Sequence, residues 1–171
     1  MKTIIKNSLF LLLLCTFIAV KAQTKDSLPP KIYNPQANAK AELASAVSLA
    51  KAQNKHVLIQ VGGNWCIWCL RLHEFCAKNQ KVDSTLKANY VFTLINFSKD
   101  NKNEEILSQF GPVQRFGYPV WLILDENGKL IHIQETGLLE EGKGYSEEKI
   151  VGVLNHWSKT AIDPKTYIKK Q

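Results

Sequence analysis

A pair of closely spaced cysteines is the feature of the sequence with the clearest capacity for chemistry. The segment Cys66-Ile67-Trp68-Cys69 follows an apolar run and two glycines, and helical spacing of apolar residues begins at its first cysteine. The free amides and dipole of a first helical turn favour a thiolate, and a second thiol one turn later can resolve a mixed disulfide. This pattern predicts thiol–disulfide exchange, with Cys66 attacking and Cys69 resolving.

The same residue types could also bind a metal ion or form a static local disulfide. A zinc ribbon needs a second cysteine pair, which the sequence lacks. Cys66, Cys69, His73 and Cys76 lie along one face of the predicted helix over about 15 Å, too far to surround one ion. We therefore expect no metal site unless that helix breaks, and no cofactor, because the chain has no nucleotide or flavin motif. The static disulfide stays open as an alternative.

The first 22 residues have the pattern of a secretory signal peptide. Lys2 and Lys6 precede an apolar run from Leu9 to Val20, and small residues suit cleavage before Gln23. The run is shorter than the roughly 18 to 20 apolar residues of a membrane-spanning helix. We therefore expect export to the periplasm or the exterior, with no membrane insertion after cleavage.

The positive charge of the chain depends partly on that segment. Removal of residues 1–22 deletes three lysines and no acidic residue, which lowers the formal charge from +7 to +4. The lysines between residues 25 and 102 are scattered, without an arginine cluster or a stripe of aromatic and basic residues. This distribution argues against nucleic acid as a partner.

Three cysteines remain after such cleavage, because Cys15 lies within the apolar run. Two of them form the closely spaced pair, and Cys76 is left over. Cys76 follows Cys69 by seven residues, which places it about 10 Å further along a helix axis, too far for direct resolution. We expect Cys76 to be a buried, unreactive thiol.

Apolar periodicity predicts a single domain of alternating helices and strands. The Pro-Pro segment 23–33 is expected to be a linker, residues 34–162 the domain and residues 163–171 a tail. The predicted helices cover residues 34–53, 66–78, 104–110 and 146–157, and the predicted strands cover residues 56–61, 90–97, 120–124 and 129–134. The last two strands are expected to form a hairpin around an Asn-Gly turn.

Two motifs together resemble the thioredoxin-fold family over about residues 36–160. The first is Gly62-Gly63-Asn64-Trp65-Cys66-Ile67-Trp68-Cys69, and the second is Gly117-Tyr118-Pro119 ahead of a later strand. The resemblance implies an α/β fold, a three-layer sandwich with a central mixed β-sheet flanked by helices, and a cis Pro119 against the cysteine pair. Within the family the chain looks most similar to exported domains such as the terminal periplasmic domain of the transmembrane thiol:disulfide interchange reductase.

The resemblance also implies a function for the cysteine pair. Cys66 and Cys69 would form a redox-active disulfide that exchanges with protein substrates, with electrons from an unidentified thiol donor. Trp65, Trp68, Tyr118 and Pro119 are the expected substrate-contacting residues. The uncharged spacer lacks a cation to stabilise the thiolate further and favours a reducing direction. The alternatives are a non-catalytic protein-binding module with a structural disulfide, and thiol-based metal handling.

Two positions depart from the family pattern. Thioredoxins bury an aspartate six residues before the first cysteine, where it helps to move the proton of the second thiol. Gln60 stands at that position and cannot titrate, so resolution must use water or another group, with His73 and Glu74 nearby in sequence. Val120 follows the expected cis proline where many relatives have threonine, which predicts a more apolar groove.

The remaining aromatic and histidine residues fit ordinary structural roles. Trp121 and Trp157 fall on core-facing positions of a predicted strand and helix. His56, His132 and His156 lie at element ends or on alternating strand faces, without the spacing of a metal site or catalytic group. We expect these histidines at the surface.

Overall fold

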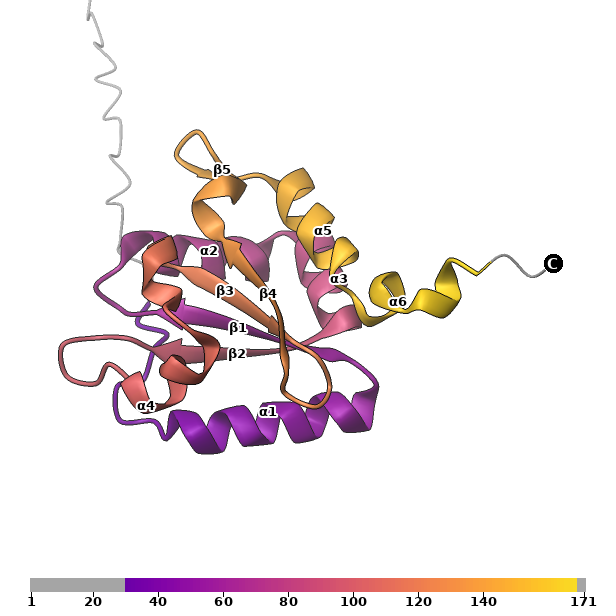
Figure 1. Ribbon diagram of the computed structural model, residues 1–171. Coiled ribbons are helices and arrows are strands. Elements are labelled where there is room, and N and C mark those ends of the chain that lie inside the picture. The colour runs from indigo at the N-terminus through magenta and orange to yellow at the C-terminus, as the bar shows by residue number, and fades with distance from the viewer. Residues whose placement is uncertain (1–29, 169–171) are drawn as a thin grey trace, which may run out of the picture.

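The computed structural model describes residues 30–168, which form three layers with a β-sheet in the middle (Figure 1). The predicted signal peptide and most of the predicted linker lie outside the described residues. Within residues 30–168 no helix combines the length and apolar content needed to cross a membrane.

The central sheet is mixed and has four strands, and its inner strand β1 is buried along its whole length. The strands are β1 (His56–Gly62), β2 (Tyr90–Asn96), β3 (Val120–Leu124) and β4 (Leu130–Glu135), in the order β2-β1-β3-β4. β1 runs parallel to β2 and antiparallel to β3. The nearly continuous apolar sequence of β1 follows from this position, because both of its faces are covered.

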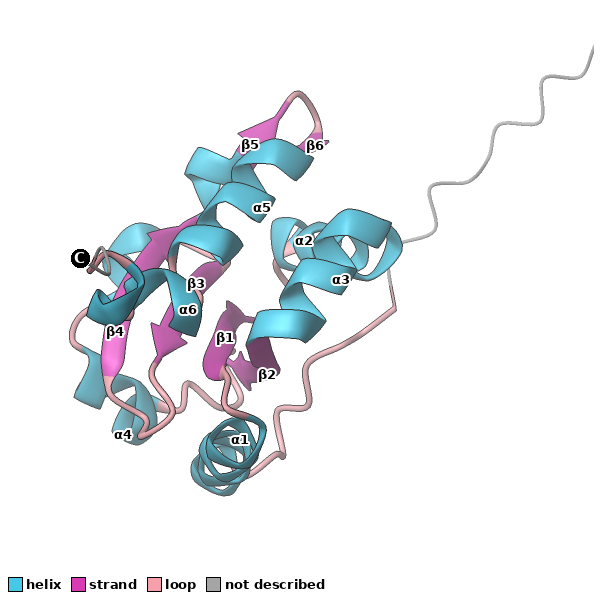
Figure 2. Ribbon diagram, turned by 90° about the vertical axis from the view of Figure 1, so that its right-hand side faces the viewer, coloured by secondary structure: helices cyan, strands magenta, loops and turns pink. Residues whose placement is uncertain are grey.

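Helices cover both faces of the sheet (Figure 2). One face packs against α1 (Ala39–Gln53) and the short α4 (Glu104–Leu107), and the other packs against α2 (Ile67–Lys78), α3 (Gln80–Asn89) and α5 (Glu147–His156). Alternate residues of β1 divide between the two cores: Val57 and Ile59 face α1, whereas Leu58 faces α2. This arrangement confirms the predicted α/β three-layer sandwich.

Several smaller elements complete the domain. They are the 3₁₀ turns at Ser108–Phe110, Val113–Phe116, Thr136–Leu139 and Pro164–Thr166, the ribbon of β5 (Glu140–Glu141) and β6 (Gly144–Tyr145), and α6 (Lys159–Ile162). The β3–β4 hairpin turns as predicted at Asn127-Gly128, where Gly128 has a φ of +82° that favours glycine.

The helix predictions were wrong at two points: the start of the first helix and the region of α3. The first helix starts at Ala39, because Asn38 caps it by accepting a bond from the Ala41 amide at 3.0 Å, whereas Asn34 makes a local turn with Gln36. Helix α3 was not predicted at all. Its sequence is polar and buries only two apolar side chains, so its periodic signal is weak.

The prediction of a surface position was also wrong for His56. Its side chain is 1% exposed, and Nδ1 donates to the Trp157 carbonyl at 2.9 Å, which ties the start of β1 to the end of α5. Trp157 is only partly buried and stacks on His132, with ring centres 4.2 Å apart. Trp121 is fully buried, as predicted.

Cys76 is a free thiol in the core between the sheet and α2, α3 and α5, and it is 4% exposed. Burial, with a smaller contribution from the nearby Asp83 carboxylate, raises the pKa of this thiol to about 12. Its position agrees with the predicted buried, unreactive thiol.

The substitution Leu154→Ala should strongly destabilise the fold. Leu154 is fully buried in α5, and the truncation leaves a cavity, so the free energy of unfolding should fall by about 2–5 kcal/mol in denaturant titrations. Leu138→Ala is the matched control, because Leu138 is 64% exposed and the change should stay within about 0.5 kcal/mol. Equal losses for both variants would contradict the assigned core.

Cys76 should resist alkylation in the native reduced protein. With a pKa of about 12, only about one Cys76 thiol in 10⁴ is ionised at about pH 8, and burial blocks access as well. Mass-spectrometric mapping after iodoacetamide treatment should find Cys76 unmodified in buffer and modified in guanidinium chloride. Fast native labelling of Cys76 would show that this part of the core opens.

Candidate active site

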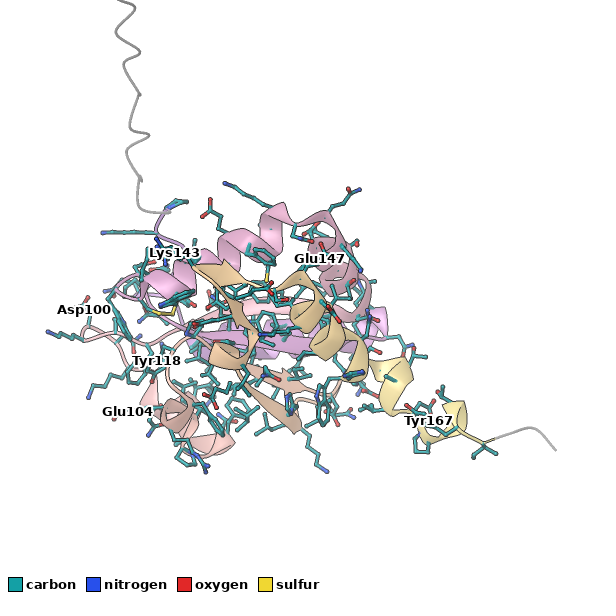
Figure 3. All side chains as sticks on the ribbon, turned by 90° about the horizontal axis from the view of Figure 1, so that it is seen from above. Asp100, Glu104, Tyr118, Lys143, Glu147 and Tyr167 are labelled. Carbon is teal, nitrogen blue, oxygen red and sulfur yellow. A yellow bond between two sulfur atoms is a disulfide. The ribbon has the colours of Figure 1, made fainter. Side chains whose placement is uncertain are left out.

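The cysteine pair lies where the central strand passes into α2. β1 ends at Gly62, the Cys66 amide then donates to the Gly63 carbonyl at 3.0 Å, and Cys66 becomes the N-cap of α2. Cys66 and Cys69 form a disulfide. Figure 3 shows it as a yellow bond at the end of the molecule that carries Tyr118, opposite the end with Tyr167.

The two sulfurs have unequal surroundings. Cys66 is 7% exposed and Cys69 is fully buried. The Cys66 sulfur accepts a bond from the Cys69 amide at 3.1 Å, so the first turn of α2 points an N–H group at it. When the disulfide is reduced, this amide and the helix dipole stabilise a thiolate on Cys66. The accessible sulfur is therefore also the one that the helix activates.

The loop before β3 lies against the same sulfur. The Tyr118–Pro119 bond is cis, as the family resemblance implied, and the Tyr118 carbonyl oxygen is 3.5 Å from the Cys66 sulfur. The Thr136 hydroxyl donates to the Pro119 carbonyl and ties the loop to the segment after β4. A free backbone edge is thus held beside the disulfide.

Val120 was expected to make the groove more apolar, but the structure places its side chain away from the groove. Its side chain is fully buried in the core under α1, and its backbone pairs with Val61 of β1. The position helps to hold β3 against β1 and does not line the surface beside the disulfide.

Three aromatic rings form a wall on one side of Cys66. Trp65 is 59% exposed, and its indole N–H donates to the Phe97 carbonyl at 2.7 Å. Tyr118 stacks on Phe97 with ring centres 4.8 Å apart and meets Trp65 edge-on at 5.6 Å. A cleft of about 620 Å³ opens beside Trp65 and Phe97 and is rimmed by Lys31 and Lys99. The sequence pointed to Trp65 and Tyr118 but not to Phe97.

Trp68 lies on the opposite side of the pair and is half-buried. Its ring meets Tyr145 edge-on at 5.7 Å, and the Arg71 guanidinium lies 5.2 Å from its centre. The Tyr145 hydroxyl also donates to the Trp68 carbonyl at 3.2 Å. The structure therefore places Trp68 in a packed position and leaves Trp65 as the exposed tryptophan beside the disulfide.

Gln60 lies behind the buried cysteine, as its position six residues before the pair implied. Its Nε2 donates to the Tyr33 hydroxyl at 2.7 Å and to the Cys69 carbonyl at 3.1 Å, and its Oε1 accepts from the Trp121 indole at 3.3 Å. An amide with both ends occupied is stable in the core without a charge.

Tyr33 belongs to the site although the sequence analysis placed it at the end of a linker. It is 4% exposed and packs against Cys66 and Cys69. Asn64 holds it there, because Oδ1 accepts from the Ile32 and Tyr33 amides at 2.9 and 3.0 Å and Nδ2 donates to the Tyr33 carbonyl at 2.7 Å. The only sequence signal was an apolar pair after Pro-Pro.

The two side chains considered for proton transfer have other surroundings. His73 is half-buried, stacks on Phe92 at 5.9 Å, and has its pKa lowered by burial. Glu74 forms an ion pair with Lys78 at 2.5 Å on the outer surface of α2. Neither side chain has a recorded hydrogen bond to the cysteine pair among the described residues.

Comparison with known proteins gives relatives of the same kind. A family model described as thioredoxin-like matches residues 38–126, more than half of the chain. The thiol:disulfide interchange protein DsbD of Actinobacillus pleuropneumoniae serotype 5b (strain L20) is 28% identical over 93 residues, which cover 54% of this chain and only 15% of that protein.

Two solved structures share the fold at low sequence identity. The disulphide isomerase from Xylella fastidiosa Temecula1 has a TM-score of 0.64 and 23% identity, covering 72% of this chain and 93% of that one. A DsbH oxidoreductase has a TM-score of 0.51 and 17% identity, covering 78% and 89%. Together with the sandwich fold, the cis Tyr118–Pro119 bond and the Cys66–Cys69 disulfide, the family match shows that this chain belongs to the thioredoxin-like family.

Proposed function

We propose that the protein is an exported thiol–disulfide oxidoreductase that reduces disulfides in protein substrates through Cys66 and Cys69. The observation that carries the proposal is the inequality of the two sulfurs. Cys66 is the more accessible and caps α2, whereas Cys69 is fully buried behind it. A structural disulfide has no need of this division, but an exchange reaction needs one attacking and one resolving thiol.

The reaction has two steps and transfers two electrons. The Cys66 thiolate attacks one sulfur of a substrate disulfide, which forms a mixed disulfide and releases the first substrate thiol. The Cys69 sulfur then attacks Cys66, forms the Cys66–Cys69 disulfide and releases the second substrate thiol. The substrate disulfide is reduced and the cysteine pair is oxidised. A thiol donor, not yet identified, must then reduce the pair again.

Protein substrates suit the surface around Cys66. The Tyr118 carbonyl lies at a free backbone edge beside the sulfur and can pair with an extended substrate strand. The wall of Trp65, Phe97 and Tyr118 offers apolar contact to neighbouring substrate residues. Trp65 and Tyr118 are the side chains of this proposal that contact substrate, and the buried Pro119 sets the course of the backbone beside Cys66 through its cis bond. Trp68 packs against Tyr145 and is a more peripheral contact.

Export and the reducing direction rest on the sequence. The first 22 residues have the pattern of a cleaved signal peptide, which supports export to the periplasm or the exterior. The spacer Ile67-Trp68 contains no cation that would stabilise the Cys66 thiolate and make the pair strongly oxidising. The similarity to an interchange protein and to a disulphide isomerase is compatible with exchange in general.

The substitution Cys69→Ala should trap substrates on Cys66. Without the resolving thiol the mixed disulfide persists, so non-reducing electrophoresis should reveal covalent adducts that disappear on adding a reductant. Cys76→Ala is the matched control and should trap nothing, because Cys76 lies in the core away from the reaction. The absence of adducts after reaction of pre-reduced Cys69→Ala with disulfide-bonded proteins, in buffer free of reductant, would refute the exchange mechanism.

The reduction potential of the pair should lie near about −270 mV, the value of a reducing thioredoxin. Equilibration in dithiothreitol or glutathione buffers followed by alkylation and mass spectrometry measures it, and insulin reduction tests the same direction. A potential near about −120 mV would instead indicate an oxidant. A potential below about −300 mV without insulin reduction would indicate a structural disulfide.

A further inference from the structure

The surroundings of Cys69, the proposed resolving thiol, disfavour a negative charge on its sulfur. Cys69 is fully buried, and burial disfavours the thiolate that the second step requires. Within residues 30–168 no aspartate, glutamate, lysine or arginine is buried, and the position of the family's aspartate carries the neutral Gln60. The step therefore needs a neutral hydrogen-bond donor close to the Cys69 sulfur.

Tyr33 is a donor in the right place. A methyl group added to Gly62 would lie 2.5 Å from the Cys69 sulfur and 2.9 Å from the Tyr33 hydroxyl, so both atoms lie over the same glycine. The Gln60 amide donates to the Tyr33 oxygen, which leaves the hydroxyl proton available for an acceptor. In the disulfide form no acceptor for that proton is recorded among the described residues.

The hydroxyl is held in this position from two sides. Asn64 makes three hydrogen bonds to the backbone of Ile32 and Tyr33, and it lies only two residues before Cys66. Gln60 fixes the other end of the side chain and also bonds to the Cys69 carbonyl. The same small network therefore positions both the donor and the cysteine that would accept from it.

We propose that the Tyr33 hydroxyl donates a hydrogen bond to the Cys69 thiolate and so promotes the resolving step. This inference rests on the exchange function proposed above and deepens it. Tyr33 acts as a donor and not as a base, because burial raises the pKa of its phenol beyond any physiological range. In thioredoxins a buried aspartate assists the second thiol, and here a neutral hydroxyl would assist it instead by stabilising the thiolate.

The balance of the step is simple. The Cys69 sulfur forms a bond to Cys66, the bond between Cys66 and the substrate sulfur breaks, and the proton of the Cys69 thiol ends on the departing substrate thiol. Tyr33 keeps its own proton throughout.

Two other tyrosines lie near the pair: the Tyr118 carbonyl faces the Cys66 sulfur, and the Tyr145 hydroxyl bonds to the Trp68 carbonyl. Burial raises the pKa of both, so they stay neutral. On α2 itself, burial raises the pKa of Cys76 and lowers that of His73, Arg71 lies on the Trp68 ring, and Glu74 pairs with Lys78.

The test compares Tyr33→Phe with Tyr90→Phe in acid-quench kinetics of the purified chain reacting with a disulfide-bonded peptide. Tyr90 is an equally buried tyrosine whose hydroxyl donates to the Leu154 carbonyl, away from the disulfide. In Tyr33→Phe, the mixed disulfide should decay about tenfold more slowly, and the midpoint of the decay rate against pH should rise by about one unit, because the Cys69 thiolate loses its donor. The rate at which the mixed disulfide forms should stay unchanged. In Tyr90→Phe both steps should keep their rates.

The outcomes separate the two proposals. An unchanged decay rate and pH midpoint in folded Tyr33→Phe would refute the donor role and show that Tyr33 only packs against the pair. Failure of the unsubstituted chain to form a mixed disulfide would instead refute the exchange function.

A second measurement leaves Tyr33 intact. In a Cys66→Ser chain labelled with ¹³Cζ-tyrosine, the ¹³C chemical shift of Tyr33 should change with pH as the Cys69 thiol ionises. A Tyr33 chemical shift that stays constant through the ionisation of Cys69 would overturn the inference.

Discussion

The central strand β1 has no exposed face, and the position of the active site depends on this constraint. Two cores, one under α1 and one under α2, α3 and α5, hold the strand from opposite sides. β2 and β3 hold its two edges. Because β1 is fixed in this way, the residues that follow Gly62 leave the sheet at a defined point, and Cys66 caps α2 there, slightly more exposed than Cys69. The precision of the site comes from the rigid sheet rather than from the loop itself.

The division of labour between the cysteines follows from the same geometry. The first turn of a helix presents free amides to the residue that caps it, and here that residue is Cys66. One turn later the chain has already turned inward, so Cys69 is buried against Tyr33 and near Gln60. A single helix start thus provides one sulfur that the helix amide stabilises and a second, fully buried sulfur behind it, with no aspartate, glutamate, lysine or arginine buried within residues 30–168.

The sequence was most informative where a residue type has few alternatives. The cysteine pair predicted the candidate site, and the apolar runs of β1 and β3 predicted the centre of the sheet, because few other structures fit these patterns. The family resemblance of the Gly-Tyr-Pro segment implied the cis proline. It failed where tertiary contacts override weak local signals. Helix α3 is polar, and His56 is buried only because the end of α5 supplies a carbonyl to its ring. Tyr33 and Phe97 come from segments distant in sequence, and no local pattern reveals that they meet the pair.

The attachment of Tyr33 bears on the position of the N-terminal boundary of the domain. The family match starts at residue 38, after the segment that Asn64 holds against the disulfide. A chain begun at residue 38 would keep the strands and helices of the sandwich and lose Tyr33, which packs against Cys69. The proposed donor therefore lies outside the family match, and the three hydrogen bonds of Asn64 tie it to the domain.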